Sequence, residues 1–252
     1  MHTWRSRLLR TTERGTTHAQ VNRPLFEEFA TLVSSWEWDV ALLQEAPPRW
    51  LAPLARRCAA SGTLALTSRN FLAPVRASLA ELNPDLIASN EGGSNMVLVR
   101  SPGLIVALER LTVARRPERR RMLLTRVDLG EGLCCAVACL HLSVPETGQG
   151  AGEVVFAARR AIAFAGEDPL VLGGDLNLRP AEEPAAFAEL ERRFGLVPPT
   201  APRSIDHVLA RAMDVLEAPR ALPAAARQVP GPAGLALRLS DHAPVIASFG
   251  MR

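Results

Sequence analysis

The sequence predicts one α/β domain built on mixed β-sheets. Short apolar runs typical of strands outnumber segments with helical periodicity, and the two kinds alternate along the chain. With 252 residues, 48% of them hydrophobic, the chain can bury a large core, and no internal repeat divides it. We therefore expect an atypical polar N-terminal segment over residues 1–23 and a single domain over residues 24–252.

In the first half of the chain, proline positions and apolar spacing define the elements. Pro24 begins a helix whose apolar residues recur at helical spacing as far as Trp36. Residues 39–44 form a short buried strand that stops at Glu45 and the two prolines behind it. The other elements predicted here are helices over residues 50–60 and 72–82, strands over residues 95–100 and 104–113, and a hairpin of residues 121–129 and 133–142.

The second half continues the alternation of helices and strands. Helices are predicted over residues 153–165 and 183–194, with the strand 170–172 and a Gly-Gly-Asp turn between them. The last strands cover residues 204–210, 213–217 and 243–249. The Pro/Ala/Gly-rich stretch over residues 223–234 is predicted to be a loop, because it is too short to separate domains.

Composition narrows the possible functions. A net charge of +3 permits an anionic substrate without requiring one. The chain has no lysine or tyrosine, so its arginine content is better explained by the coding bias of a GC-rich genome than by DNA binding. Aromatic residues make up only 5%, which argues against recognition of single strands by stacking. No apolar export signal or bilayer-spanning run is present in the sequence, so a cytoplasmic protein is predicted.

The four cysteines do not form a metal-binding pattern. They are Cys58, Cys134, Cys135 and Cys139, and no CxxC pair occurs among them. We interpret them as small buried apolar residues in a reducing compartment.

Polar residues that can handle a phosphate ester stand at the ends of predicted strands. Glu45 follows an apolar run, and its carboxylate can bind a hard cation or simply cap a surface turn. Asp175 and Asn177 follow two glycines and, two residues apart in an extended segment, point the same way. They can hold an attacking water and a phosphate oxygen. A turn in which both bond only their own backbone is about equally well supported.

Histidines occur at two of these strand ends. His242 follows Asp241, so a carboxylate and an imidazole can divide metal binding and proton transfer between them. Asp206 can hold the ring of His242 in one tautomer. His141 ends an apolar run and is either a satisfied strand-end residue, which its position alone favours, or a phosphate contact. His207 should face away from Asp206 and is interpreted as structural.

The densest basic run covers residues 115–121, Arg-Arg-Pro-Glu-Arg-Arg-Arg. It could contact a phosphodiester backbone. A solvated loop is the preferred interpretation, because charge runs usually lie on the surface.

Taken in order, five segments resemble the endonuclease/exonuclease/phosphatase superfamily over about residues 39–249. The segments are Gln-Glu at position 44, Cys-Leu-His-Leu-Ser at 139, Gly-Gly-Asp-Leu-Asn at 173, Ser-Ile-Asp-His at 204 and Ser-Asp-His at 240. The ordered set is specific, although each member alone is weak. The resemblance implies a DNase I-like, four-layer sandwich: two packed mixed β-sheets flanked by helices, with the site at the sheet edges.

The resemblance also implies roles around a metal ion, which would be Mg²⁺ or Mn²⁺. Glu45 would be the principal metal ligand, and Asp241 would assist the metal site. Asp175 would orient or deprotonate the water, and Asn177 would position it with the phosphate.

The remaining roles concern the phosphate. His242, oriented by Asp206, would stabilise the transition state or act as a base, and His141 would donate to a phosphate oxygen or the leaving group. The implied partner is a phosphate-ester substrate, with nucleic acid among the candidates. No membrane span and no obligate protein partner are predicted.

One family feature is missing from the sequence. The family's first strand ends in Thr-Trp-Asn, and that Asn helps to hold the metal, whereas Thr3 and Trp4 are followed here by Arg5 and a polar stretch. A misplaced start or reading frame, a weakly active member, or replacement by a residue such as Asn22 would each explain this. Loss of that strand should expose a sheet edge.

The function predicted is a divalent-metal-dependent phosphoesterase of nuclease or phosphatase type, acting by in-line attack of an activated water. The alternative is a catalytically impaired member that acts as a binding or scaffold protein. Specificity in such folds lies in surface loops, here residues 70–94 and 223–234, so DNA, RNA, phospholipid head groups and small phosphodiesters all remain candidates.

Overall fold

The structure is a computed structural model of the chain. It describes residues 13–14, 18–21, 23–67, 75, 78–79, 93–116, 118–144 and 149–251. The Thr3-Trp4-Arg5 segment and Asn22 lie outside the described residues. So do most of the predicted helix 72–82 and most of the loop 70–94.

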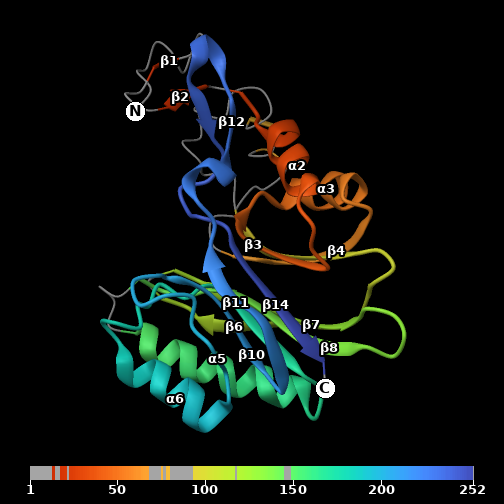
Figure 1. Cartoon of the computed structure of the whole chain (residues 1–252), viewed down its shortest axis with the longest axis vertical. Helices are drawn as coiled ribbons and strands as arrows, with labels where there is room; N and C mark the ends of the chain where they lie inside the picture. Colours follow the sequence, from red (N-terminus) through yellow and green to blue (C-terminus); the bar gives the residue numbers. More distant parts are fainter. Residues whose placement is uncertain are drawn as a thin grey trace.

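A five-stranded mixed sheet forms the centre of the lower half of the molecule in Figure 1. Its strand order is β10-β9-β8-β7-β6; β8 and β9 are parallel, and the other neighbours are antiparallel. Its strands are β6 (Leu104–Ala114), β7 (Arg120–Asp128), β8 (Cys134–His141), β9 (Leu170–Asp175) and β10 (Asp206–Arg211). Helix α5 (Gly150–Ala165) joins the parallel pair, as a crossover connection requires, and packs on the outer face beside α6 (Pro184–Phe194).

The opposite side of the sandwich consists of antiparallel strands. A three-stranded sheet has the order β3 (Val40–Ala46), β5 (Ser94–Arg100), β4 (Ala60–Leu66), and β11 (Met213–Ala221) pairs with β14 (Val245–Met251). Helices α2 (Phe26–Ser35) and α3 (Leu51–Arg57) cover the three-stranded sheet. Among the described residues, β3 pairs only with β5 and β14 only with β11. Each of these strands therefore has one edge without a strand partner among the described residues.

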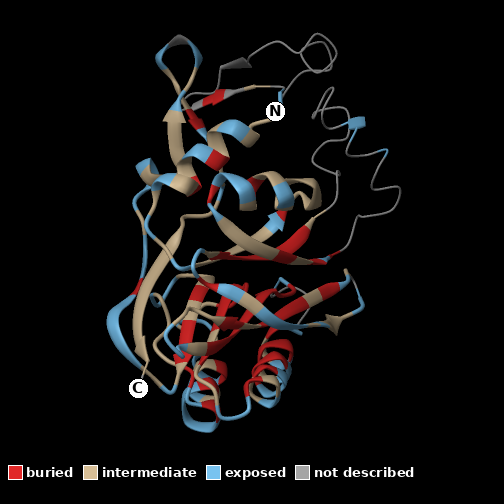
Figure 2. Cartoon of the chain, turned by 90° about the vertical axis from the view of Figure 1, so that its right-hand side faces the viewer, coloured by how far each residue is buried: buried red, intermediate tan, exposed pale blue. Residues whose placement is uncertain are grey.

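Three apolar clusters separate four layers. One fills the space between the five-stranded sheet and α5 and α6, the second lies between the sheets, and the third lies between the three-stranded sheet and α2 and α3. Strand β5 contributes to two of them: Val97 and Val99 face the other sheet, whereas Met96 and Leu98 face the helices. All four are fully buried, which explains the unbroken apolar run in this strand. In Figure 2 the buried residues gather in the sheets and on the helices that pack against them. The predicted four-layer sandwich is confirmed.

Several short strands were not predicted. Strands β1 (Glu13–Arg14) and β2 (His18–Gln20) lie in the N-terminal segment where no strand was expected, and β12 (Gln228–Pro230) lies in the expected loop. With β13 (Ala236–Arg238) they form a sheet of order β1-β2-β13-β12. Strand β4 also begins where the predicted helix 50–60 was to end. Strands β1, β2 and β12, with two or three residues each, are too short for an alternating pattern, and the pairing of β2 with β13 joins opposite ends of the chain.

The other predicted elements that fall within the described residues are present with small shifts of their ends. In the described part of the chain, no helix is both long and apolar enough to cross a bilayer. All four cysteines are free thiols, and three of them are buried.

Candidate active site

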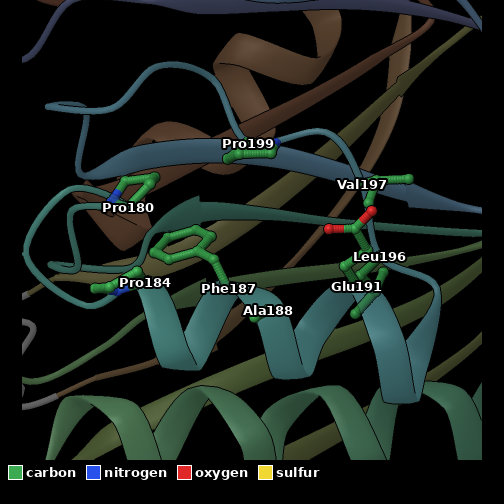
Figure 3. A pocket seen from close by; sticks show the side chains of 8 residues that line it. All are labelled: Pro180, Pro184, Phe187, Ala188, Glu191, Leu196, Val197 and Pro199. Carbon is green, nitrogen blue, oxygen red and sulfur yellow. The ribbon is translucent and has the colours of Figure 1, made fainter.

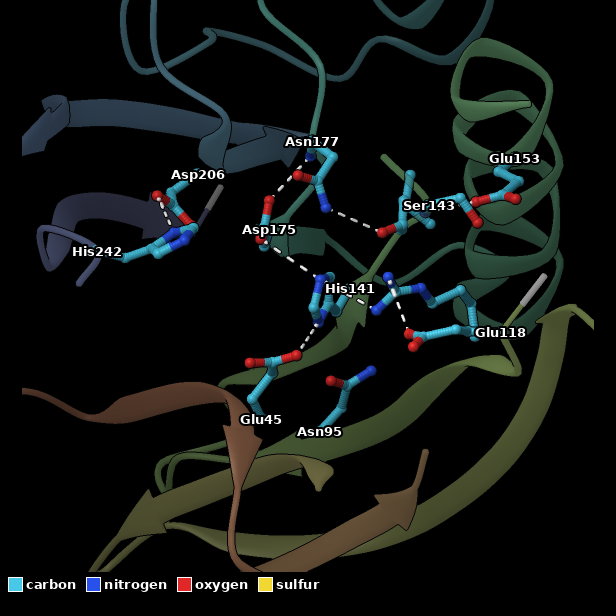
Figure 4. Close-up of polar contacts among 12 residues, drawn as sticks. Glu45, Asn95, Glu118, His141, Ser143, Glu153, Asp175, Asn177, Asp206 and His242 are labelled. Atoms are coloured by element: carbon cyan, nitrogen blue, oxygen red, sulfur yellow. Dashed lines mark hydrogen bonds and ion pairs between the residues drawn. The ribbon is translucent and has the colours of Figure 1, made fainter. Parts of the chain in front are cut away.

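Three adjacent strand ends bring polar residues from distant parts of the sequence together. In the strand register, His141 at the end of β8 lies beside Asp175 at the end of β9, and Asp175 lies beside Asp206 at the start of β10. Figure 4 shows these side chains, with His242 and Glu45, converging at one edge of the sandwich. Convergence at the strand ends was the central expectation from the sequence.

Gly174 makes this close approach possible. Its φ is +135°, a conformation that favours glycine, and a Cβ here would lie 2.0 Å from the carbonyl oxygen of Leu140. Gly173 is also confined, because an added Cβ would lie 2.8 Å from the Leu42 side chain. The two glycines therefore let β9 end tightly against its neighbours and present Asp175 to the site.

The sequence left two roles open for Asp175 and Asn177, a turn bonded to its own backbone and side chains that face the site, and the structure shows features of both. The Oδ1 atom of Asp175 accepts from the backbone N–H of Asn177 at 2.9 Å, and the Asn177 amide donates to the Leu142 carbonyl at 3.0 Å. The Oδ2 atom of Asp175 lies 3.5 Å from Nε2 of His141. The turn uses one carboxylate oxygen and leaves the other directed at the site.

Burial perturbs the acidity of Asp175. The side chain is 6% exposed, and desolvation, followed by repulsion from Asp206, raises its pKa to about 6. The backbone hydrogen bond from Asn177 and the charges of His242 and Arg120 oppose this rise. A carboxyl with this pKa can accept a proton near neutral pH.

His242 and Asp206 form a hydrogen-bonded ion pair. The Nδ1 atom of His242 lies 3.0 and 2.9 Å from the two carboxylate oxygens of Asp206. This hydrogen bond is the main reason why the pKa of His242 rises to about 9, with the charges of Asp206, Asp175 and Asp241 adding to it and partial burial opposing it. The imidazole is therefore cationic at neutral pH, and its other nitrogen is available to a phosphate oxygen.

A β-bulge directs Glu45 toward the site. Alternation along β3 would point Glu45 to the helix layer with Leu43, but the register with β5 shifts between Leu43 and Ala46, and Glu45 has φ +54°. Its Oε1 atom lies 3.8 Å from Nδ1 of His141, and the side chain is 58% exposed. Strained backbone of this kind is common where a functional side chain must be aimed, and Asn177, with φ +52°, shares it.

Arg120 is a site residue that the sequence reasoning missed. The basic run was expected to be a solvated loop, yet Arg120 opens β7 and is buried. Its Nη1 atom lies 3.1 Å from Nε2 of His141, and its Nη2 atom lies 3.4 Å from Glu118. Because arginine can only donate, Nε2 of His141 accepts, and the proton of His141 resides on Nδ1, on the side of Glu45. The position of Arg120, two residues before the first apolar residue of β7, was the available signal.

His207, which was predicted to be structural, and Asp241, which was predicted to assist the metal site, are described separately from this group. His207 is buried with its ring between backbone groups: Nδ1 accepts from Thr200, and Nε2 donates to the carbonyls of Leu178 and Ser204. Burial lowers its pKa, in keeping with a structural role. Asp241 is exposed, and its backbone carbonyl accepts from Arg227. The carboxylate of Asp241 is not one of the three groups whose ligand atoms lie within 4.8 Å of one another, although its charge acts on His242.

A cavity of about 260 Å³ lies away from these residues (Figure 3). Helix α6 and the segment after it line the cavity, which contains none of the candidate site residues. Its Phe187 packs against His207, with ring centroids 5.0 Å apart. The polar cluster is therefore separate from this cavity.

The donor set fits a hard divalent cation, with one restriction. Ligand atoms of Asp175, Asp206 and His242 lie within 4.8 Å of one another. Both Asp206 oxygens are already hydrogen-bonded to a protonated His242, and a protonated ring cannot ligate a metal. Glu45 offers an exposed carboxylate of the type that Mg²⁺ and Mn²⁺ prefer. It is the better-placed ligand.

Comparison with known proteins identifies the family. The sequence profile of the endonuclease/exonuclease/phosphatase family matches residues 19–242, most of the chain. The chain belongs to this family. Its members include phosphatases and nucleases, so the family assignment makes the chain a relative of hydrolases that act on phosphate esters. The match starts inside the segment 1–23 that was set apart from the domain.

Solved structures share the family fold at low sequence identity. A mannosyl-6-phosphatase from Bacteroides thetaiotaomicron has a TM-score of 0.65 at 12% identity, with 89% of this chain and 90% of that chain covered. The human Nocturnin catalytic domain with bound sulfate has a TM-score of 0.62 at 17% identity, covering 88% and 86%. TDP2 from D. rerio, in complex with a single-strand DNA product, has a TM-score of 0.61 at 16% identity, covering 90% and 91%. No curated protein sequence matches this chain.

Proposed function

We propose that this family member is a divalent-metal-dependent phosphoesterase that hydrolyses a phosphodiester or phosphomonoester. The observation that supports this most strongly is the arrangement of Asp175 between His141 and the Asp206–His242 pair, at three neighbouring strand ends. A carboxylate with a raised pKa beside a cationic imidazole provides a base and an anion-binding group a few ångströms apart.

In the proposed reaction, Asp175 accepts the proton of the attacking water through its Oδ2 atom while Asn177 helps to hold that water. The new bond forms between the water oxygen and phosphorus, and the bond from phosphorus to the leaving oxygen breaks. A bound Mg²⁺ or Mn²⁺ at Glu45 would supply neutralising charge to the phosphate oxygens.

The remaining residues stabilise the phosphate during this displacement. His242 donates to an equatorial phosphate oxygen, held in place by Asp206. His141 donates from Nδ1 to a phosphate oxygen or the leaving group, and Arg120 fixes that tautomer from the other side of the ring. Fixed donors of this type act strongly because they need no reorganisation as charge develops.

The substrate class is proposed only at the level of a phosphate ester. The similar structures include a sugar phosphatase and a protein bound to DNA product, so the shared fold does not favour one of these classes. A non-catalytic binding protein that has kept the fold is the competing function, motivated by the sequence Thr3-Trp4-Arg5 where the family has Thr-Trp-Asn.

The test is hydrolysis by purified protein of supercoiled plasmid, a chromogenic phosphodiester and a chromogenic phosphomonoester, each with Mg²⁺, Mn²⁺ or EDTA. Turnover should require metal and fall at least about 100-fold in Asp175→Ala and His242→Ala. Glu189→Gln, which removes an exposed ion pair on α6, is the matched control and should keep full activity. Turnover that survives EDTA or both site substitutions would exclude the proposed chemistry.

A second arm separates the enzyme from the scaffold. Calorimetric titration with Mn²⁺ should show binding that Glu45→Gln abolishes. Binding of Mn²⁺ without turnover of any substrate would favour an impaired site, whereas neither binding nor turnover would favour the scaffold.

A further inference from the structure

A buried amide near the start of β5, that of Asn95, has no role in the proposed reaction. Asn95 lies on the same face of β5 as Val97 and Val99, which point into the space between the two sheets. It is the first of these inward-facing residues along the strand and is 0% exposed. The row therefore changes from apolar to polar at the edge of the sandwich where the candidate site lies.

One hydrogen bond fixes the orientation of this amide. The Nδ2 atom of Asn95 donates to the backbone carbonyl of Arg121 at 2.5 Å. Exchanging Nδ2 and Oδ1 would place two oxygens against each other, so Oδ1 must point the other way. In the described part of the chain, this Oδ1 is buried and has no hydrogen-bond partner. An unsatisfied buried acceptor costs about 1–3 kcal/mol, so a ligand at this position would be stabilising.

The strand register places Glu45 across from Asn95. Leu43 pairs with Met96 and Ala46 with Ser94, so the two bulge residues between them, Gln44 and Glu45, both lie across from Asn95. Figure 4 shows Asn95 beside Glu45 and below His141. Gln44 cannot serve the same purpose, because its amide is directed at Sγ of Cys139, 3.3 Å away.

We propose that Asn95 is a metal ligand, its Oδ1 atom binding the same divalent cation as the Glu45 carboxylate. This rests on the proposed function, which places a cation at Glu45. A neutral amide oxygen beside a carboxylate is a donor pair suited to Mg²⁺ or Mn²⁺. Asn95 thereby supplies, from β5, the amide that the missing N-terminal Asn would have contributed.

The experiment is Mn²⁺ titration of the EDTA-stripped full chain by calorimetry, with thermal unfolding of each variant as a second readout. The wild-type chain should bind Mn²⁺, Glu45→Gln should not, and Asn95→Ala should bind at least about 10-fold more weakly. The matched control is Gln44→Met, which alters the neighbouring amide and should stay within about 2-fold of wild type.

A second variant, Asn95→Asp, keeps the oxygen and adds charge. It tests the proposal even if Asn95→Ala does not fold. It should unfold at a lower temperature than wild type without metal, since its second oxygen faces the Arg121 carbonyl. Saturating Mn²⁺ should raise its unfolding temperature by more than that of wild type.

The outcomes separate the two proposals. If Asn95→Ala binds Mn²⁺ like wild type while Glu45→Gln does not, a water satisfies Oδ1, and the assignment of Asn95 fails while the proposed function stands. The assignment also fails if Mn²⁺ stabilises Asn95→Asp no more than wild type. If the wild-type chain does not bind Mn²⁺, both proposals fail.

Discussion

Replacing Asp206 with asparagine tests the electrostatic core of the site. Both carboxylate oxygens of Asp206 contact Nδ1 of His242, and this hydrogen bond is the first cause of the raised pKa, about 9, of that ring. Asparagine keeps the shape and an oxygen acceptor but removes the charge. We expect the pKa of His242 in Asp206→Asn to fall toward the ordinary histidine value of about 6.5.

The size of the effect follows from the two pKa values. At pH 8, a group with a pKa of about 9 is about nine-tenths protonated, whereas one with a pKa of about 6.5 is about one-thirtieth protonated. If the imidazolium binds the phosphate, Asp206→Asn should lose about 30-fold in kcat at pH 8 from this cause alone.

The stability of the fold should also depend on the ion pair between Asp206 and His242. The folded-state pKa of His242 is raised, so the ion pair stabilises the fold fully below about pH 6.5, and this contribution is lost as pH rises through about 9. The unfolding temperature of the wild-type chain should therefore fall more between pH 6.5 and 9 than that of Asp206→Asn. The side chain of His242 is 39% exposed, so solvent screens the pair and the difference should be modest.

The assay is an NMR titration of the histidine ring protons in EDTA-stripped protein, paired with a pH–rate profile. Asp241→Asn is the matched control, because Asp241 raises the same pKa through charge alone and as the last of its causes. A pKa that stays near 9 in Asp206→Asn would refute the assignment of the pair. A pKa that falls without loss of kcat at pH 8 would refute the role of the imidazolium.

Three further substitutions test single features of the site. Asp175→Asn should abolish turnover. It should also raise the free energy of unfolding of the metal-free protein by about 1–3 kcal/mol at pH 8, because a carboxyl with a pKa of about 6 destabilises the fold when it is ionised. Urea unfolding at pH 8 and pH 5 should show that this gain in stability is smaller at the lower pH. Gly174→Ala should lower the free energy of unfolding by more than about 4 kcal/mol, or prevent soluble expression, since its Cβ would lie 2.0 Å from a backbone oxygen; chemical denaturation measures this. Arg120→Lys should reduce kcat/KM about 10-fold in steady-state kinetics, because an ammonium cannot reproduce the planar fork that meets His141.

The strand-end residues could be predicted because local sequence determines them. An apolar run followed by Gly173 and Gly174 indicates a strand that stops in a tight turn, and a spacing of two puts Asp175 and Asn177 on one side. That His141 and Asp206 end in register with Asp175 depends on the fold, and the ordered motifs of the family supplied it.

The features that sequence reasoning missed depend on distant contacts. Alternation in β3 points Glu45 away from the site, and only the pairing with β5 reveals the bulge that turns it back. Arg120 belongs to a basic run whose pattern is that of a surface loop, and its burial depends on its contact with β8. Asn95 is a third case. A polar residue at the start of an apolar strand gives no sign, in the sequence, of the backbone carbonyl that orients its amide.

Asp206 has opposite chemical consequences for its two neighbours, and this predicts the working pH range. Its charge helps to raise the pKa of Asp175 to about 6 by repulsion, and its hydrogen bond raises the pKa of His242 to about 9. Between these values Asp175 is ionised and His242 is protonated, the pairing that a base and an anion-binding group require. The pH–rate profile should therefore be a bell with a plateau between about pH 6 and 9. Burial is the larger cause of the raised pKa of Asp175, but Asp206 contributes to both limits. Asp206→Asn should therefore move the two limbs downward together, whereas independent groups would let only one limb move.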